Sequence, residues 1–272
     1  MLKISKLSKY FGRGTVNEVL ALDNLSLHVS PGEFVCVIGS NGSGKSTLMG
    51  CVSGNHQPDD GRIDLNGEDI TLWPEYKRAK KIGRVFQDPL SGTCASMTIM
   101  ENMALANRRG LPRTLRLGVT KKERLKFQTA LARLDLGLED RLADKVGLLS
   151  GGQRQSLTLL MSTLLRPTIL LLDEHTAALD PKTANLVMEL TRDIVEKENL
   201  TTIMITHNMQ QALSYGTRLI MMHRGKFLLD FNAKEKARLS VEDLLHHFHA
   251  ANPTFPGQPL TDQPLTDQMV LA

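Results

Sequence analysis

The chain has 272 residues, 41% of them hydrophobic, which is enough for one large domain or for a core with a subdomain. Its longest apolar runs, such as the one from Phe34 to Ile38, are far shorter than the roughly 18 residues of a membrane-spanning helix. This excludes an integral membrane protein. The net charge of +4 arises from 33 basic and 29 acidic residues that are interspersed, so it does not by itself indicate nucleic-acid binding.

The N-terminus and the cysteines indicate the compartment. The residues that follow Met1 contain no long apolar segment and no small-residue cleavage site, so we expect a cytosolic protein. The three cysteines, Cys36, Cys51 and Cys94, are odd in number and lack Cys-x-x-Cys spacing. This pattern argues against a disulfide framework and a zinc site, and predicts three buried thiols.

Strand patterns dominate the first third of the chain. Apolar residues that alternate or run together predict strands over residues 2–8, 24–29, 33–38, 62–65 and 81–86. Asn66-Gly67, directly after the fourth strand, is typical of a hairpin turn. We therefore expect this region to be mainly sheet.

Helical patterns replace the strands from about residue 95 to 165. A helix is predicted over residues 121–136, with Leu125, Leu131 and Leu134 as its apolar positions and Gly137 as its end. Because strands resume afterwards, we interpret the stretch as an inserted helical subdomain.

The last third alternates strand and helix, which is typical of a parallel sheet. Strands over 168–172 and 201–206 flank a helix over 182–197. A hairpin is predicted around Arg224-Gly225, and Ser240 is placed to cap a final helix.

A glycine-rich loop follows the strand over 33–38. Its residues match the phosphate-binding pattern G-x-x-x-x-G-K-[ST]: Gly39, Ser40, Asn41, Gly42, Ser43, Gly44, Lys45, Ser46 and Thr47. Glycines let backbone N–H groups curl around phosphates at the positive end of the next helix. We expect Lys45 to reach the β- and γ-phosphates and Ser46 to ligate Mg²⁺. The loop therefore predicts a nucleoside triphosphate ligand.

Three polar residues stand at the ends of apolar strands. Asp173 and Glu174 follow the strand over 168–172, and His207 follows the strand over 201–206. Ligands bind at the carboxyl ends of strands in open α/β sheets, so these side chains are candidates for the same site. We expect Asp173 to hold Mg²⁺ through water, Glu174 to act as general base, and His207 to hydrogen-bond the γ-phosphate.

Leu149-Ser150-Gly151-Gly152-Gln153 matches the signature of ATP-binding-cassette (ABC) ATPases, and the chain resembles that family over residues 2 to about 248. The resemblance implies an α/β fold: a P-loop NTPase (RecA-like) core with an N-terminal antiparallel β subdomain and an inserted α-helical signature subdomain. The implied boundaries are a core over 1–88 and 166–248, a helical subdomain over about 89–165, and a flexible tail over 249–272. The repeat of proline and polar residues in 252–272 also predicts a mobile extension.

The resemblance assigns further residues. Gln87 resembles the Q-loop glutamine, with a catalytic role and a share in the Mg²⁺ site beside Ser46 and Asp173. Asp180, after Ala178-Leu179, resembles the D-loop aspartate, and His207 resembles the switch histidine. The ring that stacks on adenine is expected to be Phe11, with Tyr10 as the alternative.

The signature residues are expected to serve a second molecule of ATP. Ser150 is placed to cap a helix that begins at Gly151, whose N–H groups would be exposed at the positive helix end. The resemblance implies that Ser150, Gly151, Gly152 and Gln153 contact the ATP of a neighbouring subunit. Two cassettes would then form a head-to-tail homodimer around two nucleotides.

The resemblance implies that the chain hydrolyses ATP to drive a separate membrane permease from the cytoplasmic face of the cell membrane. A single cassette favours an importer, which would also use an extracytoplasmic solute-binding protein, without a nucleic-acid partner. The string from Asp173 to Asp180 is similar to that of cassettes thought to carry amino acids. The alternatives are an exporter subunit and a non-transport ATPase, although no long heptad run of the latter is present.

Two positions depart from the family pattern. His175 replaces the usual proline after the glutamate, and Ala177 replaces a common serine before the D-loop. The stretch from Arg154 to Thr158 also differs from the alanine-rich helix of importers. None of these departures removes a catalytic group.

Three further sets of residues have alternative interpretations. One set is either the lining of a permease groove or helix core: Met97, Ile99, Met100, Met103 and Leu105. A basic set either faces phospholipid or permease or lies in a solvated loop: Arg108, Arg109, Arg113, Arg116, Lys121 and Lys122. The third set either forms a metal site or is exposed to solvent: His246, His247 and His249. We expect exposure, because side chains at adjacent positions of a helix point in different directions.

Overall fold

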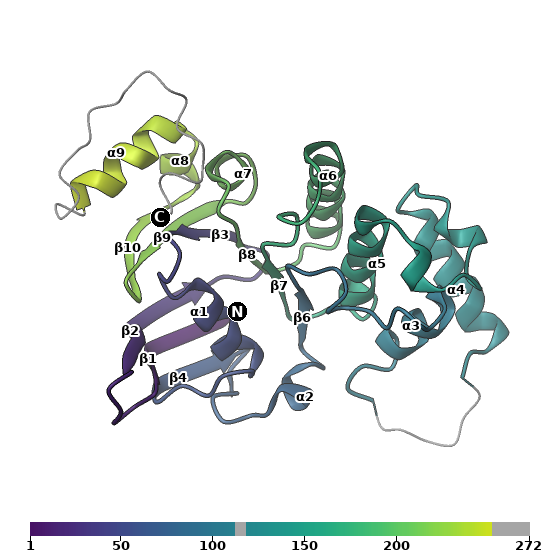
Figure 1. Ribbon diagram of the computed structural model, residues 1–272, viewed down its shortest axis with the longest axis horizontal. Coiled ribbons are helices and arrows are strands. Elements are labelled where there is room, and N and C mark those ends of the chain that lie inside the picture. Colours follow the sequence, from purple (N-terminus) through teal and green to yellow (C-terminus); the bar gives the residue numbers. More distant parts are fainter. Residues whose placement is uncertain (112–117, 252–272) are drawn as a thin grey trace. The chain divides into compact units, whose positions relative to one another are not determined.

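The computed structural model describes residues 1–111 and 118–251, with the side chains of residues 248–251 left aside. Its strands, drawn in Figure 1, are β1 (Leu2–Phe11), β2 (Val19–Val29), β3 (Phe34–Gly39), β4 (Asp60–Leu65), β5 (Glu68–Asp69), β6 (Ile82–Val85), β7 (Ile169–Asp173), β8 (Thr202–Ile205), β9 (Arg218–His223) and β10 (Lys226–Phe231). Its helices are α1 (Lys45–Ser53), α2 (Glu75–Arg78), α3 (Ile99–Ala106), α4 (Lys121–Ala132), α5 (Gly151–Thr163), α6 (Pro181–Lys197), α7 (Met209–Ser214), α8 (Ala233–Lys236) and α9 (Val241–Ala251). Short 3₁₀ helices cover Leu138–Asp140 and Val146–Leu148.

Two compact units divide the chain, and each is described by itself. Unit 1 combines Met1–Leu72 with Ile203–Ala272, and unit 2 runs from Trp73 to Thr202. Within the described ranges, no helix is long and apolar enough to cross a membrane. The predicted tail falls outside the described residues beyond Ala251, where α9 ends.

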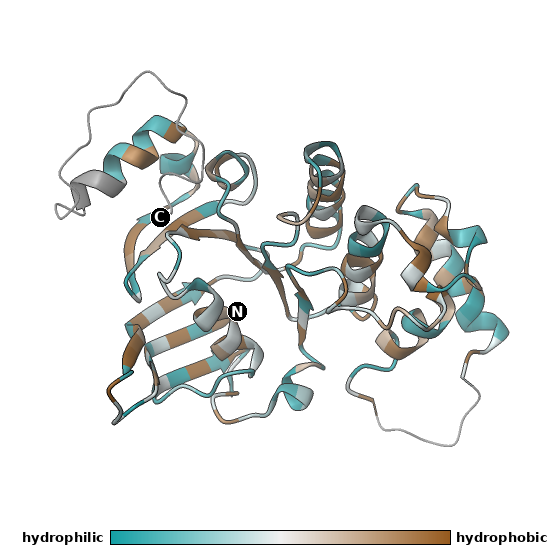
Figure 2. Cartoon of the chain, viewed as in Figure 1, coloured by the Kyte–Doolittle hydropathy of each residue, from teal (hydrophilic) through white to brown (hydrophobic). Residues whose placement is uncertain are grey.

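An antiparallel sheet in the order β2-β1-β4-β5 forms one part of unit 1. Leu2 and Ile4 of β1 are buried, and after an irregularity at Lys6 the buried position moves to Leu7. Bands of hydrophobic and hydrophilic colour along β1 and β2 follow this alternation in Figure 2. Both strands are longer than predicted. Positive φ angles of 49° at Lys6 and 51° at Asn24 coincide with register shifts that interrupt the two-residue period.

The second sheet of unit 1 contains the strands in the order β10-β9-β3-β8. β9 runs parallel to β3, with Val35 opposite Arg218, and β10 is antiparallel to β9. The run from Phe34 to Ile38 is buried, as expected for a strand covered on both faces. The parallel direction gives β3 and β9 a common carboxyl-terminal edge.

Two hairpin turns and one helix cap in unit 1 confirm their predictions. Asn66 and Gly67 have φ angles of 54° and 81°, and Arg224 and Gly225 have φ angles of 45° and 76°. Positive φ at both central residues is the requirement of a type I′ turn. Ser240 caps α9, because its hydroxyl accepts the backbone N–H three residues on at 3.1 Å.

Unit 2 contains the parallel strand pair β6 and β7. Ile82 lies opposite Ile169 and Val85 opposite Leu172, and all four side chains are buried. α5 packs against β6 and against α6. Because the two strands are parallel, the residues that follow them leave the sheet at one edge.

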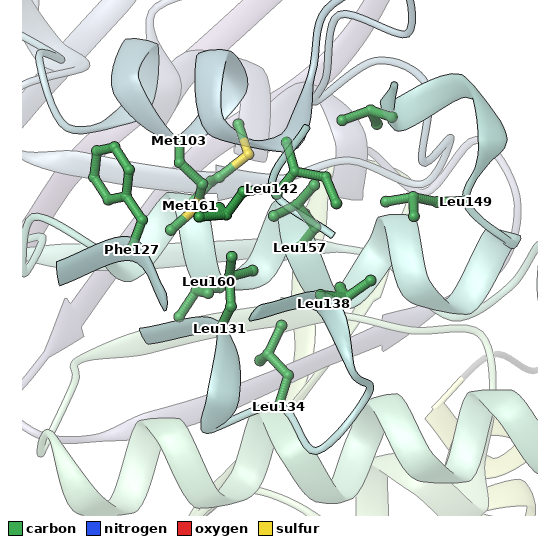
Figure 3. Packing of buried hydrophobic residues seen from close by; sticks show 12 residues of the cluster. Met103, Phe127, Leu131, Leu134, Leu138, Leu142, Leu149, Leu157, Leu160 and Met161 are labelled. Atoms are coloured by element: carbon green, nitrogen blue, oxygen red, sulfur yellow. The ribbon is translucent and has the colours of Figure 1, made fainter. Parts of the chain in front are cut away.

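The helices α3, α4 and α5 of unit 2 enclose a hydrophobic cluster, shown in Figure 3. Met103 comes from α3, Phe127 and Leu131 from α4, and Leu157 and Leu160 from α5. Each of these side chains is at most 3% exposed. The cluster is the core of the inserted helical region that the sequence predicts.

The prediction for α4 was wrong at two points. The helix ends at Ala132, before 136, because the chain reaches a positive φ of 52° at Asp135. Leu125 is 65% exposed, and Phe127 takes the core position. Phe127 and Leu131 are four residues apart and share one helix face, whereas a residue two positions before Phe127 points elsewhere.

The structure decides between interpretations for part of the open sets. Ile99 and Met103 are fully buried in the cluster, which identifies them as helix core, whereas Leu105 is 55% exposed. Arg109 neither faces outward nor lies in a solvated loop: its Nη2 donates to the carbonyl oxygens of Ser162 and Leu165, at 3.0 and 3.3 Å. Arg109 therefore satisfies carbonyls at the carboxyl end of α5.

Further members of these sets lie on α9 or outside the described residues. His246 and His247 are exposed on α9. Arg113 and Arg116 fall outside the described residues, and so does the side chain of His249.

Cys94 is exposed, whereas Cys36 and Cys51 are buried, which corrects the prediction of three buried thiols. A hydrogen bond with the Ser96 hydroxyl lowers the pKa of Cys94, and burial raises the pKa of Cys36 to about 12. A lower pKa means more reactive thiolate near neutral pH. We expect a maleimide to label Cys94 in the native chain and Cys36 only after unfolding, as followed by mass spectrometry.

Ser96→Ala tests the cause of this reactivity. The variant should slow the labelling of Cys94, because the pKa of the thiol rises towards its ordinary value. Equal rates at Cys94 and Cys36 in the native chain would contradict the assignment.

Candidate functional site

The phosphate loop joins β3 to α1 in unit 1. Residues 39–47 form the loop and the first turn of α1, which begins at Lys45. Lys45 is only 6% exposed, and its Nζ donates to the backbone carbonyl oxygens of Gly39 and Ser40 at 2.7 and 3.0 Å. The loop's own carbonyl groups thus solvate the buried ammonium group.

Two glycines of the loop leave no room for a side chain. A Cβ on Gly39 would lie 2.2 Å from the Met222 carbonyl oxygen, and one on Gly44 would lie 2.5 Å from that of Ala21. Gly44 is also the N-cap of α1, with φ of 100° and no side-chain cap. The first N–H groups of α1 are therefore available to an anion such as phosphate.

His207 lies two residues beyond β8 in unit 1. The backbone N–H of Thr206 donates to the carbonyl oxygen of Val37 on β3, at 3.2 Å. This bond holds the end of β8 beside β3. His207 is therefore at the edge of unit 1 from which the phosphate loop leaves.

The two aromatic candidates end β1. Phe11 is 38% exposed, and its ring meets His56 edge-on, with 5.3 Å between centroids. The ring of Tyr10 is covered by the guanidinium of Arg13, 5.0 Å from its centroid. A cation lies near the Phe11 ring as well, with Lys9 Nζ 5.6 Å from its centroid, so only the greater exposure of Phe11 favours it for stacking on a planar base.

Asp173 and Gln87 lie at one edge of the strand pair in unit 2, since Asp173 ends β7 and Gln87 follows β6. Asp173 Oδ2 pairs with Arg84 Nη2 at 3.0 Å, and the Arg84 guanidinium lies 4.6 Å from the centre of the Phe86 ring. Gln155, fully buried on α5, donates from Nε2 to the Phe86 carbonyl oxygen at 3.0 Å. The signature helix thus fixes the chain directly before Gln87.

Arg84 and Gln155 are functional candidates that the sequence analysis missed. Their partners lie 89 and 69 positions away along the chain. Such pairs depend on packing between distant segments, so they leave no local pattern. The guanidinium of Arg84 balances the charge of the Asp173 carboxylate.

A tight turn follows Asp173. Glu174 has φ of 44°, in the left-handed region that favours glycine, and its carbonyl oxygen accepts the N–H of Ala177 at 2.9 Å. His175 is 2% exposed, and its Nε2 lies 3.1 Å from Thr191 Oγ1 on α6. Burial lowers the pKa of His175 to about 4, so its ring is neutral near neutral pH.

The signature residues open α5, as predicted. Ser150 Oγ accepts the N–H of Gln153 at 3.3 Å, and the Ser150 N–H donates to Gln153 Oε1 at 3.2 Å. This reciprocal pair is a capping box. Gly151 and Gly152 form the first helical positions, without a side chain over their N–H groups. A helix amino end of this kind is suited to contact an anion.

Gly152 also abuts the first turn of α6, which Asp180 caps by accepting the Thr183 N–H at 3.1 Å. A Cβ on Gly152 would lie 2.1 Å from Thr183 Cγ2. We therefore expect Gly152→Ala to destabilise the chain by about 1–3 kcal/mol through overpacking. Thr183→Ser removes that methyl group and should restore stability in the double variant.

Differential scanning fluorimetry and phosphate release, measured on both single variants and the double variant, check this prediction. Recovery of stability without recovery of hydrolysis would give Gly152 a second role, in phosphate contact. An unchanged melting temperature of Gly152→Ala would contradict the packing argument.

The donor groups of each unit fit ATP and Mg²⁺. In unit 1, the lysine ammonium and the uncapped N–H groups of α1 complement phosphate oxygens. The hydroxyl of Ser46, the amide oxygen of Gln87 and the carboxylate of Asp173 are hard oxygen donors of the kind that Mg²⁺ prefers.

Comparison with known proteins agrees with these observations. Residues 22–177 match the family described as ABC transporter. The chain is 49% identical over 255 residues to the tyrosine transport ATP-binding protein of Clostridioides difficile. The aligned region covers 92% of this chain and 100% of that protein. It is 35% identical over 241 residues to the methionine import ATP-binding protein MetN of Bartonella henselae, covering 86% of this chain and 66% of MetN.

A solved structure of a dimeric ATP-binding cassette, in a post-hydrolysis state with ADP and phosphate, superposes with a TM-score of 0.73 at 28% identity. The match covers 86% of this chain and 99% of the cassette. The fold and the phosphate loop define a P-loop NTPase. Within that class, the chain belongs to the ABC transporter family, and it is an ATP-binding subunit that hydrolyses ATP.

Proposed function

We propose that this chain powers the import of an amino acid, of the aromatic class, through a separate membrane permease. The observation that carries the proposal is the 49% identity to a protein named for tyrosine transport, over the whole length of that protein. A second relative is named for methionine import, which supports an amino acid as cargo.

We assign the groups that bind the nucleotide as follows. Lys45 contacts the β- and γ-phosphates, and Phe11 stacks on adenine. Ser46, Gln87 and Asp173 hold Mg²⁺, which neutralises charge on the phosphates when it is bound. The two carbonyl contacts of Lys45 support its role, because they place a buried cation within the phosphate loop.

Hydrolysis is assigned to two further side chains. Glu174 accepts a proton from the attacking water, and His207 hydrogen-bonds the γ-phosphate. Glu174 directly follows Asp173 at the carboxyl end of β7, which supports its assignment as the base.

Two copies of the chain form the working ATPase in this proposal. Ser150, Gly151, Gly152 and Gln153 contact the ATP of the partner copy, and Asp180 lies in the D-loop of the same interface. The capped amino end of α5 supports this role, because it presents N–H groups at a positive helix end. The related cassette that was solved as a dimer supports the assembly.

The complete transporter is proposed to contain a permease and an extracytoplasmic solute-binding protein, with this chain on the cytoplasmic side. The names of both relatives, one for transport and one for import, support a membrane transporter.

Uptake by cells tests the proposal. Cells that lack the chain should take up less radiolabelled tyrosine, and the wild-type chain should restore uptake whereas Glu174→Gln should not. Competition by unlabelled aromatic amino acids, but not by methionine, is the expected specificity. Altered efflux with unchanged uptake would indicate an exporter, and copurification with ribosomes or DNA instead of a permease would overturn the transport function.

A further inference from the structure

The turn after β7 holds Glu174 in a backbone conformation that it does not favour. Glu174 has φ of 44°, and non-glycine residues persist in this left-handed region only where the surrounding structure requires it. Ala177 donates its N–H to the Glu174 carbonyl oxygen, which closes the turn at its two ends. An attachment of a residue inside the turn would add to what sets the direction of the Glu174 side chain.

His175 supplies such an attachment. It occupies the second position of the turn, is 2% exposed, and places Nε2 3.1 Å from Thr191 Oγ1. Thr191 is fully buried in the third turn of α6, and its hydroxyl donates to the Val187 carbonyl oxygen at 2.7 Å. A hydroxyl group has one proton, so Thr191 must accept from His175, and His175 carries its proton on Nε2.

The acceptor is rigid. α6 runs for 17 residues from Pro181 to Lys197, its first turn is capped by Asp180, and its inward face is buried. A buried hydrogen bond to such a helix fixes the imidazole in position and orientation, since leaving either partner unpaired would carry a desolvation cost.

We infer that His175 is a positioning residue for hydrolysis: its hydrogen bond to Thr191 ties the turn that carries Glu174 to α6 and so aims the Glu174 carboxylate. The inference rests on the proposed role of Glu174 as general base. His175 touches neither nucleotide nor water in this role. Proline would meet the same need differently, because it presets the φ angle that the second position of a turn requires.

Steady-state kinetics on the full chain test the inference. His175→Ala should lower kcat about tenfold or more and leave KM for ATP within about twofold, because misplacement of a catalytic group costs rate while the phosphate loop is intact. His175→Pro should recover most of the lost kcat. Thr191→Val should reproduce the loss, and the His175→Ala/Thr191→Val double variant should be no slower than either single variant.

Thr163→Val is the matched control for Thr191→Val. Thr163 is also a buried helical threonine whose hydroxyl donates to the carbonyl oxygen four residues earlier, that of Leu159 at 3.1 Å. It lies in α5 and has no contact with His175 among its hydrogen bonds. Thr163→Val should lower the melting temperature as Thr191→Val does, while its kcat stays at the wild-type value.

Each outcome bears on the inference. The inference is overturned if His175→Ala has a normal kcat or if His175→Pro fails to recover activity. It is also overturned if the losses in kcat multiply in the double variant, or if Thr163→Val loses as much kcat as Thr191→Val. Glu174→Gln is assayed beside these variants. If Glu174→Gln hydrolyses ATP normally, the proposed base is wrong, whereas an inactive Glu174→Gln together with a normal His175→Ala removes only the positioning role.

Discussion

Glu174→Gln should retain ATP and lose hydrolysis. The amide has nearly the size of the carboxylate but cannot accept the proton of the attacking water, and loss of a general base typically lowers the rate by about 10²–10⁴-fold. The phosphate loop is unchanged in this variant, so the affinity for a fluorescent ATP analogue should match the wild type. Phosphate release and analogue titration measure the two quantities.

The same variant should accumulate as a dimer. If hydrolysis normally separates two ATP-bound copies, a copy that cannot hydrolyse ATP stays associated, and size-exclusion chromatography in saturating Mg-ATP should show twice the monomer mass. Glu196→Gln on the exposed face of α6 is the control and should behave as the wild type. A monomeric Glu174→Gln, or one with a normal rate, is incompatible with the proposed roles.

Lys45→Ala should weaken nucleotide binding itself. A hydrogen bond to a charged group contributes about 1.5–3 kcal/mol, and 1.4 kcal/mol corresponds to a factor of ten. The Kd for ATP should therefore rise by roughly 10- to 100-fold. Fluorescence titration with an ATP analogue provides the measurement.

Unit 1 offers a matched control for this substitution. Lys236 is 5% exposed, and its ammonium group donates to the carbonyl oxygens of Tyr215 and Gly216, much as that of Lys45 does to Gly39 and Ser40. Lys236→Ala should lower the melting temperature and leave Kd unchanged. Equal losses of affinity in both variants would reduce the role of Lys45 to stability.

The positions of the catalytic motifs could be predicted because their physical causes are local. The phosphate loop is nine consecutive residues between a buried strand and a helix, and the hairpin turns need only two residues with positive φ. The cap at Ser150 likewise involves a partner three residues away. Interactions of such short range leave a pattern in the sequence.

Predictions of burial failed where the exposure of a side chain depends on which elements pack against it. Leu125 has the helical spacing of a core residue and yet is exposed, because the adjoining helices contact the face that carries Phe127 and Leu131. The exposure of Cys94, by contrast, had a local signal, because it stands among small and polar residues whereas the buried Cys36 stands in the apolar run from Phe34 to Ile38.

The sequence by itself determined that this chain is an ABC ATPase and which residues form its motifs. Only the tertiary structure decided how those residues are held. Arg84 pairs with Asp173, Gln155 donates a hydrogen bond to Phe86 directly before Gln87, and His175 is hydrogen-bonded to Thr191. Each pair joins segments between 16 and 89 positions apart. Their partners are selected by strand register and helix packing, which depend on the whole unit and not on any one stretch of sequence.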